Sequence, residues 1–144
     1  MTLVPLLPIF HRLNREHFQG SLVNDYIPLV RIRWSDGKLT RTAGFYRRRY
    51  LISGAGSSEI VLSKPVLRNL PKEALESTLC HEMIHAWIDL ILKKKEGHGP
   101  LFHERMNVIN HSQDAFKVTV RHSFPVQERT YKCKLEYKSQ VSNS

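Results

Sequence analysis

Short stretches in the first half of the chain alternate between hydrophobic and polar positions, and this pattern predicts β-strands. In Val30–Trp34, three apolar side chains alternate with two arginines, and a period of two is typical of a strand with one buried face. Further strands are expected at Thr42–Arg48 and Glu59–Ser63, on either side of a glycine- and serine-rich loop. We expect the three strands to form one small antiparallel sheet.

Hydrophobic positions three and four residues apart predict helices elsewhere in the chain. A short helix is expected over Pro8–Gly20, the longest over Pro71–Glu96, and a third over Pro100–Asn110. The middle of the longest helix is apolar on almost every side, so we expect it to be buried at the centre of the protein. Lys93–Lys95, at its end, are expected to complement the negative end of the helix dipole.

Two more alternating stretches, Phe116–Arg121 and Tyr131–Tyr137, predict strands near the C-terminus. The sequence has no internal repeat, no low-complexity block and no linker. We therefore expect one domain over residues 1–138 and a flexible tail over residues 139–144. The fold class predicted from these elements is α+β, with the small sheet packed on helices.

The composition is that of a globular protein, since 41% of the 144 residues are hydrophobic and 24% are charged. No apolar run approaches the roughly 20 residues of a transmembrane helix. Met1–Phe10 lacks the basic leader and the cleavage site of a signal peptide. The two cysteines cannot build a disulfide framework, and free thiols suit a reducing compartment. We expect a protein of the cell interior that is not secreted and has no membrane partner.

The net charge of +9 points to a polyanionic partner, with nucleic acid as the first candidate. Tyr46–Tyr50 places three arginines between two tyrosines, as single-strand binders do for stacking and phosphate contact. The alternative interpretation of this stretch is a solvated strand end. In order of preference, the candidate DNA contacts are Arg47, Arg48 and Arg49, then Lys93, Lys94 and Lys95, and last Lys132 and Lys134.

The longest predicted helix contains the motif His81-Glu82-Met83-Ile84-His85. Residues four apart lie on one helix face, so the two imidazoles can bind one metal ion. Zinc suits imidazole ligands and lowers the pKa of a bound water towards about 7. Glu82 can then act as the general base for this water when it attacks a peptide carbonyl. A shuffled chain of this composition would contain the motif only about 0.02 times, which favours one catalytic zinc.

A catalytic zinc needs a third protein ligand and one open position. His98 is our first candidate, because Gly97 and Gly99 on either side of it allow a sharp turn back towards the metal. Pro100 then fixes the start of the next helix. His103 is the alternative third ligand.

Two neighbours of the motif also need an interpretation. Asp89, four residues after His85, either accepts a hydrogen bond from that imidazole or faces solvent. Cys80 adjoins a candidate ligand but points to a different face of the helix, so we expect a core residue and not a nucleophile.

These segments resemble the SprT-like zinc metallopeptidases and, within them, the Spartan branch of DNA-dependent metalloproteases. The resemblance is strongest at Leu79–Ala86, which holds the H-E-x-x-H motif, and at Glu96–Phe102, which holds a Gly-His-Gly-Pro turn. Many zincins share H-E-x-x-H, whereas its combination with this turn is more specific. The resemblance covers about residues 8–133 and includes Phe18–Leu22, Trp34–Ser35, Ala43–Gly44, Ile60–Pro65 and His122–Phe124.

The resemblance implies a zincin-like (minigluzincin-like) core in which His81, His85 and His98 hold one zinc ion and Glu82 is the catalytic base. It also implies a DNA-dependent protease that degrades proteins crosslinked to DNA and cleaves itself. The expected partners are DNA with single-stranded character and the proteins bound to it. We expect a monomer, located in the nucleus of a eukaryotic cell or otherwise in the cytoplasm.

Many relatives carry a small zinc-binding module after the protease core, introduced by a Tyr-x-Cys element. Tyr131-Lys132-Cys133 matches that element, but no second cysteine follows it here. A single cysteine cannot hold a structural zinc. Either the sequence stops before the remaining ligands of that module or this protein dispenses with it, and in both cases we expect cations of the core to contact DNA.

Two alternative functions remain open from the sequence. The first is a SprT-like peptidase without DNA dependence, and the second is a non-catalytic, zinc-stabilised DNA-binding module. The intact Glu82 counts against the second alternative, because a structural zinc needs no general base.

Overall fold

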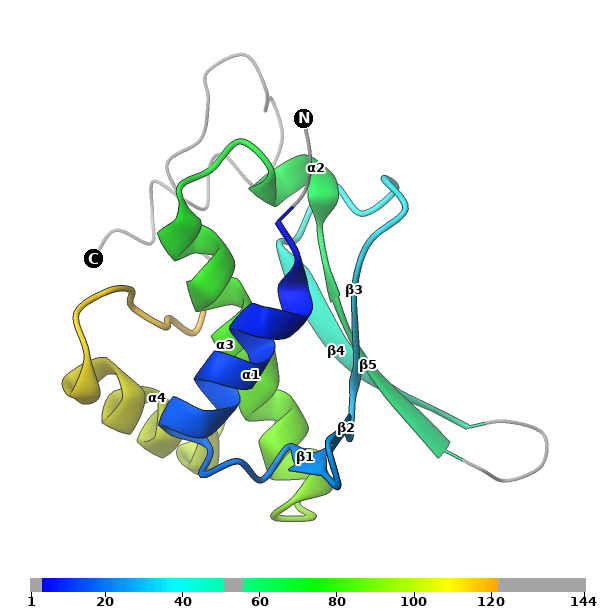
Figure 1. Ribbon diagram of the computed structural model, residues 1–144. Helices are drawn as coiled ribbons and strands as arrows, with labels where there is room; N and C mark the ends of the chain where they lie inside the picture. The colour runs from blue at the N-terminus through cyan, green and yellow to red at the C-terminus, as the bar shows by residue number, and fades with distance from the viewer. Residues whose placement is uncertain (1–3, 51–55, 122–144) are drawn as a thin grey trace.

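A three-stranded sheet with α1 and α3 on one of its faces forms the centre of the fold (Figure 1). The computed structural model describes residues 4–50 and 56–121. The helices are α1 (Leu6–His17), α2 (Lys64–Leu67), α3 (Lys72–Leu90) and α4 (Pro100–Ser112). The strands are β1 (Val23–Asn24), β2 (Ile27–Pro28), β3 (Arg31–Trp34), β4 (Gly44–Tyr50) and β5 (Gly56–Leu62). The architecture is mixed α+β, as the sequence predicts.

The sheet is mixed, which corrects the expectation of an antiparallel sheet. Its strand order is β3-β5-β4, with β4 antiparallel and β3 parallel to β5. The segment 35–43 carries the chain from β3 past the end of β5 to the opposite edge of the sheet (Figure 1). The side-chain alternation of a strand is the same in both kinds of pairing, so the sequence pattern could not distinguish them.

Two serines hold this crossing in place. The backbone N–H of Ser35 donates to the Leu62 carbonyl at 2.8 Å, and that of Ser63 donates to the Ala43 carbonyl at 2.7 Å. The Ser63 hydroxyl also donates to the Leu39 carbonyl at 2.6 Å. Both ends of the crossing segment are therefore tied to the C-terminal end of β5, which puts β3 and β4 on opposite sides of that strand.

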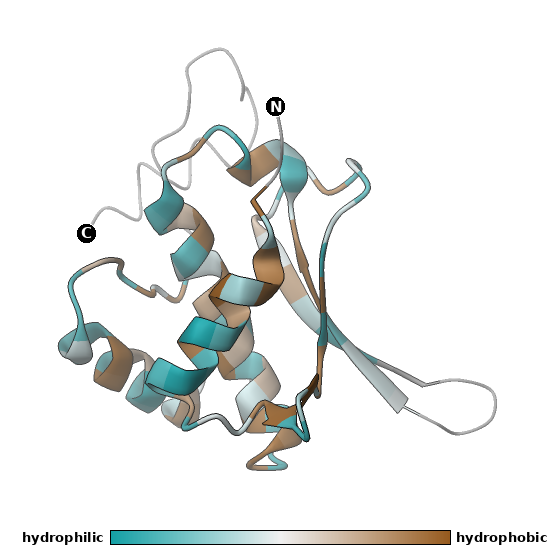
Figure 2. Cartoon of the chain, in the orientation of Figure 1, coloured by the Kyte–Doolittle hydropathy of each residue, from teal (hydrophilic) through white to brown (hydrophobic). Residues whose placement is uncertain are grey.

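Helix α3 is the central helix, and its middle is buried as predicted. The side chains of Leu79, Cys80, Met83 and Ile84 have no exposed surface. Helix α1 covers part of α3 and keeps its hydrophilic residues on the outward side (Figure 2). Burial raises the pKa of the Cys80 thiol, so this cysteine is a core residue, as expected.

Helix α3 ends earlier than the sequence predicts, at Leu90 and not at Glu96. Lys93 has a φ of 57°, in the left-handed region where a helix cannot continue. The last turn of the described helix holds no basic residue, so the expectation that Lys93–Lys95 complement the helix dipole is wrong. The three lysines instead begin the loop that carries His98.

Gly44 allows strand β4 to lie close to α3. A Cβ atom at this position would lie 2.8 Å from the Val61 carbonyl oxygen, 2.8 Å from Leu62 Cδ2 and 3.2 Å from Thr78 Cγ2. Any side chain here would force backbone atoms apart in a close-packed interior. The glycine therefore places an edge strand of the described sheet beside the helix that carries the histidine motif.

The segment after α4 has no regular secondary structure and is not the strand predicted over Phe116–Arg121. The Asn110 side chain donates to the Val118 carbonyl and accepts from the Val118 N–H, both at 2.8 Å. The Gln113 side chain pairs with the two backbone groups of Phe116 in the same way, at 2.8 and 3.0 Å. These amides satisfy backbone groups that a neighbouring strand would otherwise bind.

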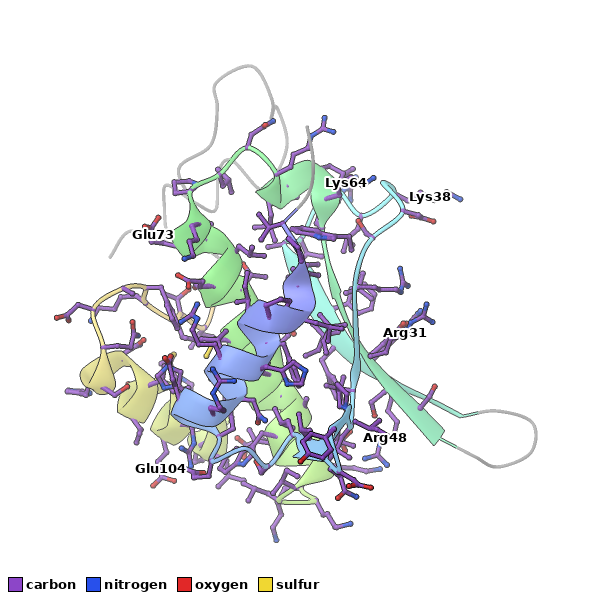
Figure 3. The ribbon with its side chains drawn as sticks, in the orientation of Figure 1. Arg31, Lys38, Arg48, Lys64, Glu73 and Glu104 are labelled. Atoms are coloured by element: carbon purple, nitrogen blue, oxygen red, sulfur yellow. The ribbon has the colours of Figure 1, made fainter. Side chains whose placement is uncertain are left out.

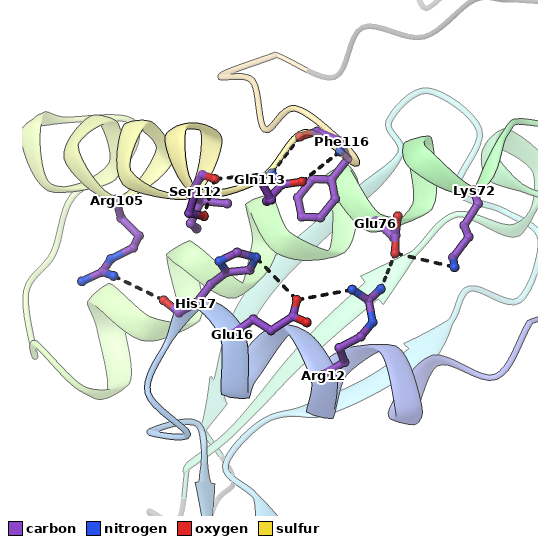
Figure 4. Close-up of polar contacts among 10 residues, drawn as sticks. Arg12, Glu16, His17, Lys72, Glu76, Arg105, Ser112, Gln113 and Phe116 are labelled. Carbon is purple, nitrogen blue, oxygen red and sulfur yellow. Dashed lines mark hydrogen bonds and ion pairs between the residues drawn. The ribbon is translucent and has the colours of Figure 1, made fainter.

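Polar contacts tie α1 to the two helices beside it (Figure 4). Arg12 forms ion pairs with Glu16 on its own helix and with the buried carboxylate of Glu76 on α3. Arg105 of α4 donates to the His17 carbonyl at the end of α1, at 3.3 Å. These contacts fix α1 across the long helix that carries the candidate site.

Some predictions concern residues outside the described ranges. These are the strand over Tyr131–Tyr137 and the flexible tail over residues 139–144. Within residues 4–50 and 56–121, every helix is too short or too polar to cross a lipid bilayer.

Candidate metal centre

Three histidine side chains from two segments converge on one point. His81 and His85 lie on successive turns of α3, and His98 lies in the loop between α3 and α4. The Nε2 atom of His98 is 3.2 Å from the Nε2 atoms of both His81 and His85. The potential ligand atoms of the three residues all lie within 4.8 Å of one another. His103, the alternative third ligand, instead places its Nδ1 atom 2.9 Å from the Gly99 carbonyl.

The spacing of the ring nitrogens fits a tetrahedral zinc ion. Zinc–nitrogen distances of about 2.0–2.1 Å put two ligand nitrogens about 3.3 Å apart in a tetrahedral site, close to the observed 3.2 Å. The Nδ1 atom of His81 lies 2.7 Å from the Thr119 carbonyl. Because a carbonyl oxygen can only accept, Nδ1 carries a proton, and the neutral ring then presents an unprotonated Nε2 to a metal ion. The donor set and its spacing therefore suit one metal ion.

Phe102 packs against all three imidazoles. Its ring centroid lies 4.8 Å from those of His81, His85 and His98, and its side chain is fully buried. The ring therefore limits the rotamers open to each histidine. Neither Phe102 nor Thr119 has a position in the sequence that would predict contact with the site, because both contacts depend on how α4 and the segment after it fold back over α3.

Glu96 organises the loop that carries His98. Its carboxylate accepts a hydrogen bond from the backbone N–H of Phe102 at 2.8 Å, and a negative charge at the N-terminus of α4 complements the helix dipole. A Cβ on Gly99 would lie 3.0 Å from the Glu96 carboxyl carbon, whereas a Cβ on Gly97 would meet nothing within 4 Å. Neither glycine has a positive φ. Of the two glycines beside His98, only Gly99 therefore lies where an added side chain would meet a neighbouring group.

Glu82 lines the same cleft as the three histidines. The cleft has a volume of about 690 Å³ and lies between the start of β4, α3 and the loop that carries His98. Glu82 is almost fully buried. Burial raises the pKa of its carboxyl, and the three histidines oppose this effect only in part. A carboxyl with a raised pKa can both accept and return a proton near neutral pH.

Asp89 joins α3 to strand β4 at the edge of the cleft. Its carboxylate accepts hydrogen bonds from the Tyr46 hydroxyl at 2.5 Å and from the Arg48 Nε at 3.0 Å. Burial and the neighbouring Asp89 raise the pKa of Tyr46 to about 12, so the hydroxyl keeps its proton. The described hydrogen bonds of Asp89 thus go to β4, which neither of the two interpretations from the sequence anticipated.

The predicted DNA contacts whose side chains the structure describes lie in two places. Successive side chains of a strand point to opposite faces, so Arg47 lies with Glu59 on the outer face of the sheet and Arg48 lies with Asp89 beside the cleft. Lys94 and Lys95 line the cleft itself. The side chains of Arg49, Lys132 and Lys134 lie outside the described part of the chain.

Two known proteins with similar sequences are named as metalloproteases. The chain is 36% identical over 121 residues to the DNA-dependent metalloprotease SPRTN of Homo sapiens, and 32% identical over 126 residues to the DNA-dependent metalloprotease dvc-1 of Caenorhabditis elegans. The matched regions cover 83% and 86% of this chain. They cover only 23% and 32% of these two relatives, so the chain spans a third of their length or less.

A further relative is the SPRTN metalloprotease of Danio rerio, which is 34% identical over 128 residues, or 86% of this chain and 18% of the relative. The family description that matches the sequence is SprT-like, over residues 6–122. This range includes the three converging histidines, Glu82 and every described element of the fold. The chain therefore belongs to the SprT-like family.

Proposed function

We propose that this chain is a zinc-dependent endopeptidase with a zincin-like (minigluzincin-like) core. The observation that carries the proposal is the convergence of the Nε2 atoms of His81, His85 and His98 beside the buried Glu82 in an open cleft. Three histidine ligands leave the fourth position of a tetrahedral zinc open, as hydrolysis requires. The names of the relatives, which are metalloproteases, support the same activity.

In the proposed reaction, His81, His85 and His98 would hold the zinc ion, which would supply Lewis acidity when bound. Glu82 accepts a proton from the water that attacks the peptide carbonyl and then donates it to the nitrogen of the leaving amine. The raised pKa of Glu82 suits both steps, because the carboxyl must hold the proton after it leaves the water and before it reaches the amine. The hydrogen bond from His81 to the Thr119 carbonyl keeps that imidazole in the orientation the site needs.

Strand β4 offers a place for the peptide substrate. It is an edge strand of the described sheet, because β5 pairs with it on one side only. Its first residues, Gly44, Phe45 and Tyr46, line the cleft together with the candidate ligands. An extended peptide can pair with such an edge through main-chain hydrogen bonds, which would place little demand on the side chains of the substrate.

We also propose that cleavage depends on DNA and acts on proteins bound or crosslinked to it, including this chain itself. The net charge of +9 and the names of the relatives support this part of the proposal. The expected partner is DNA with single-stranded character, and no membrane partner is expected. The protein would act as a monomer in DNA–protein crosslink repair, in the nucleus of a eukaryotic cell or otherwise in the cytoplasm.

Cleavage of a basic protein, with and without single-stranded DNA, tests this function. We expect cleavage by the zinc-loaded chain only when DNA is present, and a loss of cleavage by orders of magnitude in Glu82→Gln with unchanged zinc content. Equal cleavage without DNA would favour a SprT-like peptidase that does not need it. DNA binding without any cleavage that depends on Glu82 would favour a non-catalytic, zinc-stabilised DNA-binding module.

A further inference from the structure

One face of the three-stranded sheet turns away from α1 and α3, and none of the described helices covers it (Figure 1). Register places Arg31, Arg33, Phe45, Arg47, Glu59 and the buried Val61 on this face. Ile32, Ile60 and Tyr46 occupy the positions between them and pack against the core. Arg31 extends from β3 away from the helices (Figure 3). We call Arg31, Arg33 and Arg47 the arginine face.

A single buried carboxylate holds two of these arginines in place. Glu59 is only 4% exposed; its Oε1 lies 3.2 Å from Arg33 Nε and its Oε2 lies 2.5 Å from Arg47 Nε. Arg47 also lies over the Phe45 ring, with 5.4 Å between the guanidinium carbon and the ring centroid. The two guanidinium groups are therefore fixed before any ligand binds, which reduces the entropy lost on binding.

The arginine face keeps an excess of positive charge after this pairing. Burial of Glu59 raises the pKa of its carboxyl, but hydrogen bonds and charge from Arg33 and Arg47 outweigh this effect and lower the pKa overall. The carboxylate is thus ionised at neutral pH and offsets one of the three arginine charges. Within the described part of the chain, no carboxylate lies within 4 Å of Arg31. Glu59 is the one acidic residue in the sequences of β3, β4 and β5.

We propose that the arginine face binds the phosphodiester backbone of nucleic acid; this inference rests on the proposed DNA dependence. Guanidinium groups bind phosphate oxygens in a bidentate manner and keep their charge at every physiological pH. An open, flat face with fixed cations suits a backbone contact that carries no base preference.

The position of this face would link DNA binding to cleavage. Strand β4 contributes Arg47 to the arginine face and, on its opposite side, Tyr46 and Arg48 to the edge of the cleft. DNA on the outer face would therefore be separated from the proposed catalytic centre by strand β4 alone. A protein attached to that DNA would be held near the cleft without a contact between DNA and the three histidines.

The test compares Arg31→Glu with Arg15→Glu in the zinc-loaded chain. Arg31 lies on the proposed face, whereas Arg15 is an exposed residue of α1, so both variants change the net charge equally. The probe is a fluorescently labelled single strand of mixed sequence, and its anisotropy is measured over a range of salt concentrations. We expect Arg31→Glu to weaken binding at least about fivefold and to reduce the salt slope by about 0.7, while Arg15→Glu changes affinity less than about twofold.

A third variant and a competitor complete the test. Arg31→Lys keeps the charge but loses the bidentate guanidinium, so it is expected to recover only part of the affinity. Equal losses in Arg31→Glu and Arg15→Glu would overturn the proposal, as would displacement of the DNA by polyglutamate at equal charge concentration. A wild-type chain that binds no DNA would instead refute the proposed DNA dependence, whereas DNA binding insensitive to Arg31 would refute this face alone.

Discussion

The hydroxyl of Tyr46 donates a hydrogen bond of 2.5 Å to the carboxylate of Asp89 and thereby joins edge strand β4 to the last turn of α3. We predict that Tyr46→Phe lowers the free energy of unfolding by about 1 kcal/mol, since the bond is partly buried and its acceptor is charged. Urea denaturation measures this change. Tyr26→Phe is the matched control, because the side chain of Tyr26 is 93% exposed. Equal stability of the two variants would show that the bond does not hold the strand.

His98→Ala is predicted to remove most of the bound zinc, because two histidines on one helix leave the ion without a third protein ligand. His103→Ala is predicted to keep it, since the His103 ring nitrogen instead lies 2.9 Å from the carbonyl of Gly99, the residue just before α4. Elemental analysis of the purified variants measures the zinc content per chain. Stoichiometric zinc in the His98 variant would contradict the assignment.

Glu96→Ala is predicted to weaken zinc binding about tenfold without removing a ligand, a loss typical of residues that orient a ligand. The substitution removes the acceptor of the Phe102 N–H at 2.8 Å, and Phe102 packs against all three imidazoles. Competition with a chromogenic chelator measures the affinity. Glu104→Ala, an exposed position on the same helix, is the control and should leave the affinity unchanged.

Stability is predicted to fall in mild acid because of His17. Burial is the main cause that lowers the pKa of this histidine in the folded protein. In the unfolded chain a histidine binds a proton near pH 6.5, so His17 is protonated at a higher pH in the unfolded chain than in the folded protein. The stability that the neutral ring provides is therefore complete above about pH 6.5 and is lost as the pH falls towards the lowered pKa of the folded state. We expect His17→Phe to lose less stability than the wild-type chain between about pH 7.5 and about pH 5.5.

The urea midpoint at the two pH values measures this difference. Phenylalanine is chosen because the His17 ring contacts the Phe116 ring edge to face, with centroids 6.2 Å apart. His111→Phe removes an exposed histidine and should keep the wild-type dependence on pH. The same acid sensitivity in the His17 variant as in the wild-type chain would exclude His17 as its source.

Local patterns predicted the elements of the fold more accurately than the way they pair. The apolar periodicity placed the long helix and the strands, because burial of one face dictates residue type directly. The parallel pairing of β3 with β5 was not predictable, since it depends on a crossing fixed by Ser35 and Ser63. The strand expected over Phe116–Arg121 failed because the side-chain amides of Asn110 and Gln113 bind its backbone.

In the candidate metal centre, too, local features were predictable and long-range contacts were not. The i, i+4 spacing of His81 and His85 is a property of one helix, so the sequence alone predicted that both can reach one ion. His98 was also predicted, on the local chemistry of its turn. The supporting contacts of Thr119, Phe102 and Glu96 arise from segments that fold back over α3, and no local pattern encodes them.

The close approach of β4 to α3 leads to a final prediction about two glycines. Gly44→Ala is predicted to lower the free energy of unfolding by about 1–3 kcal/mol, because its Cβ would lie 2.8 Å from the Val61 carbonyl oxygen, a backbone atom that cannot move aside cheaply. The strand that lines the cleft must then shift, so peptide cleavage should fall as well. Gly97→Ala is the matched control beside the proposed ligand His98, since its Cβ would enter open space. Urea denaturation and zinc content are measured on both variants. We expect a loss of stability in Gly44→Ala and wild-type values in Gly97→Ala. A stable, fully active Gly44→Ala would mean that the close approach of β4 to α3 is not required.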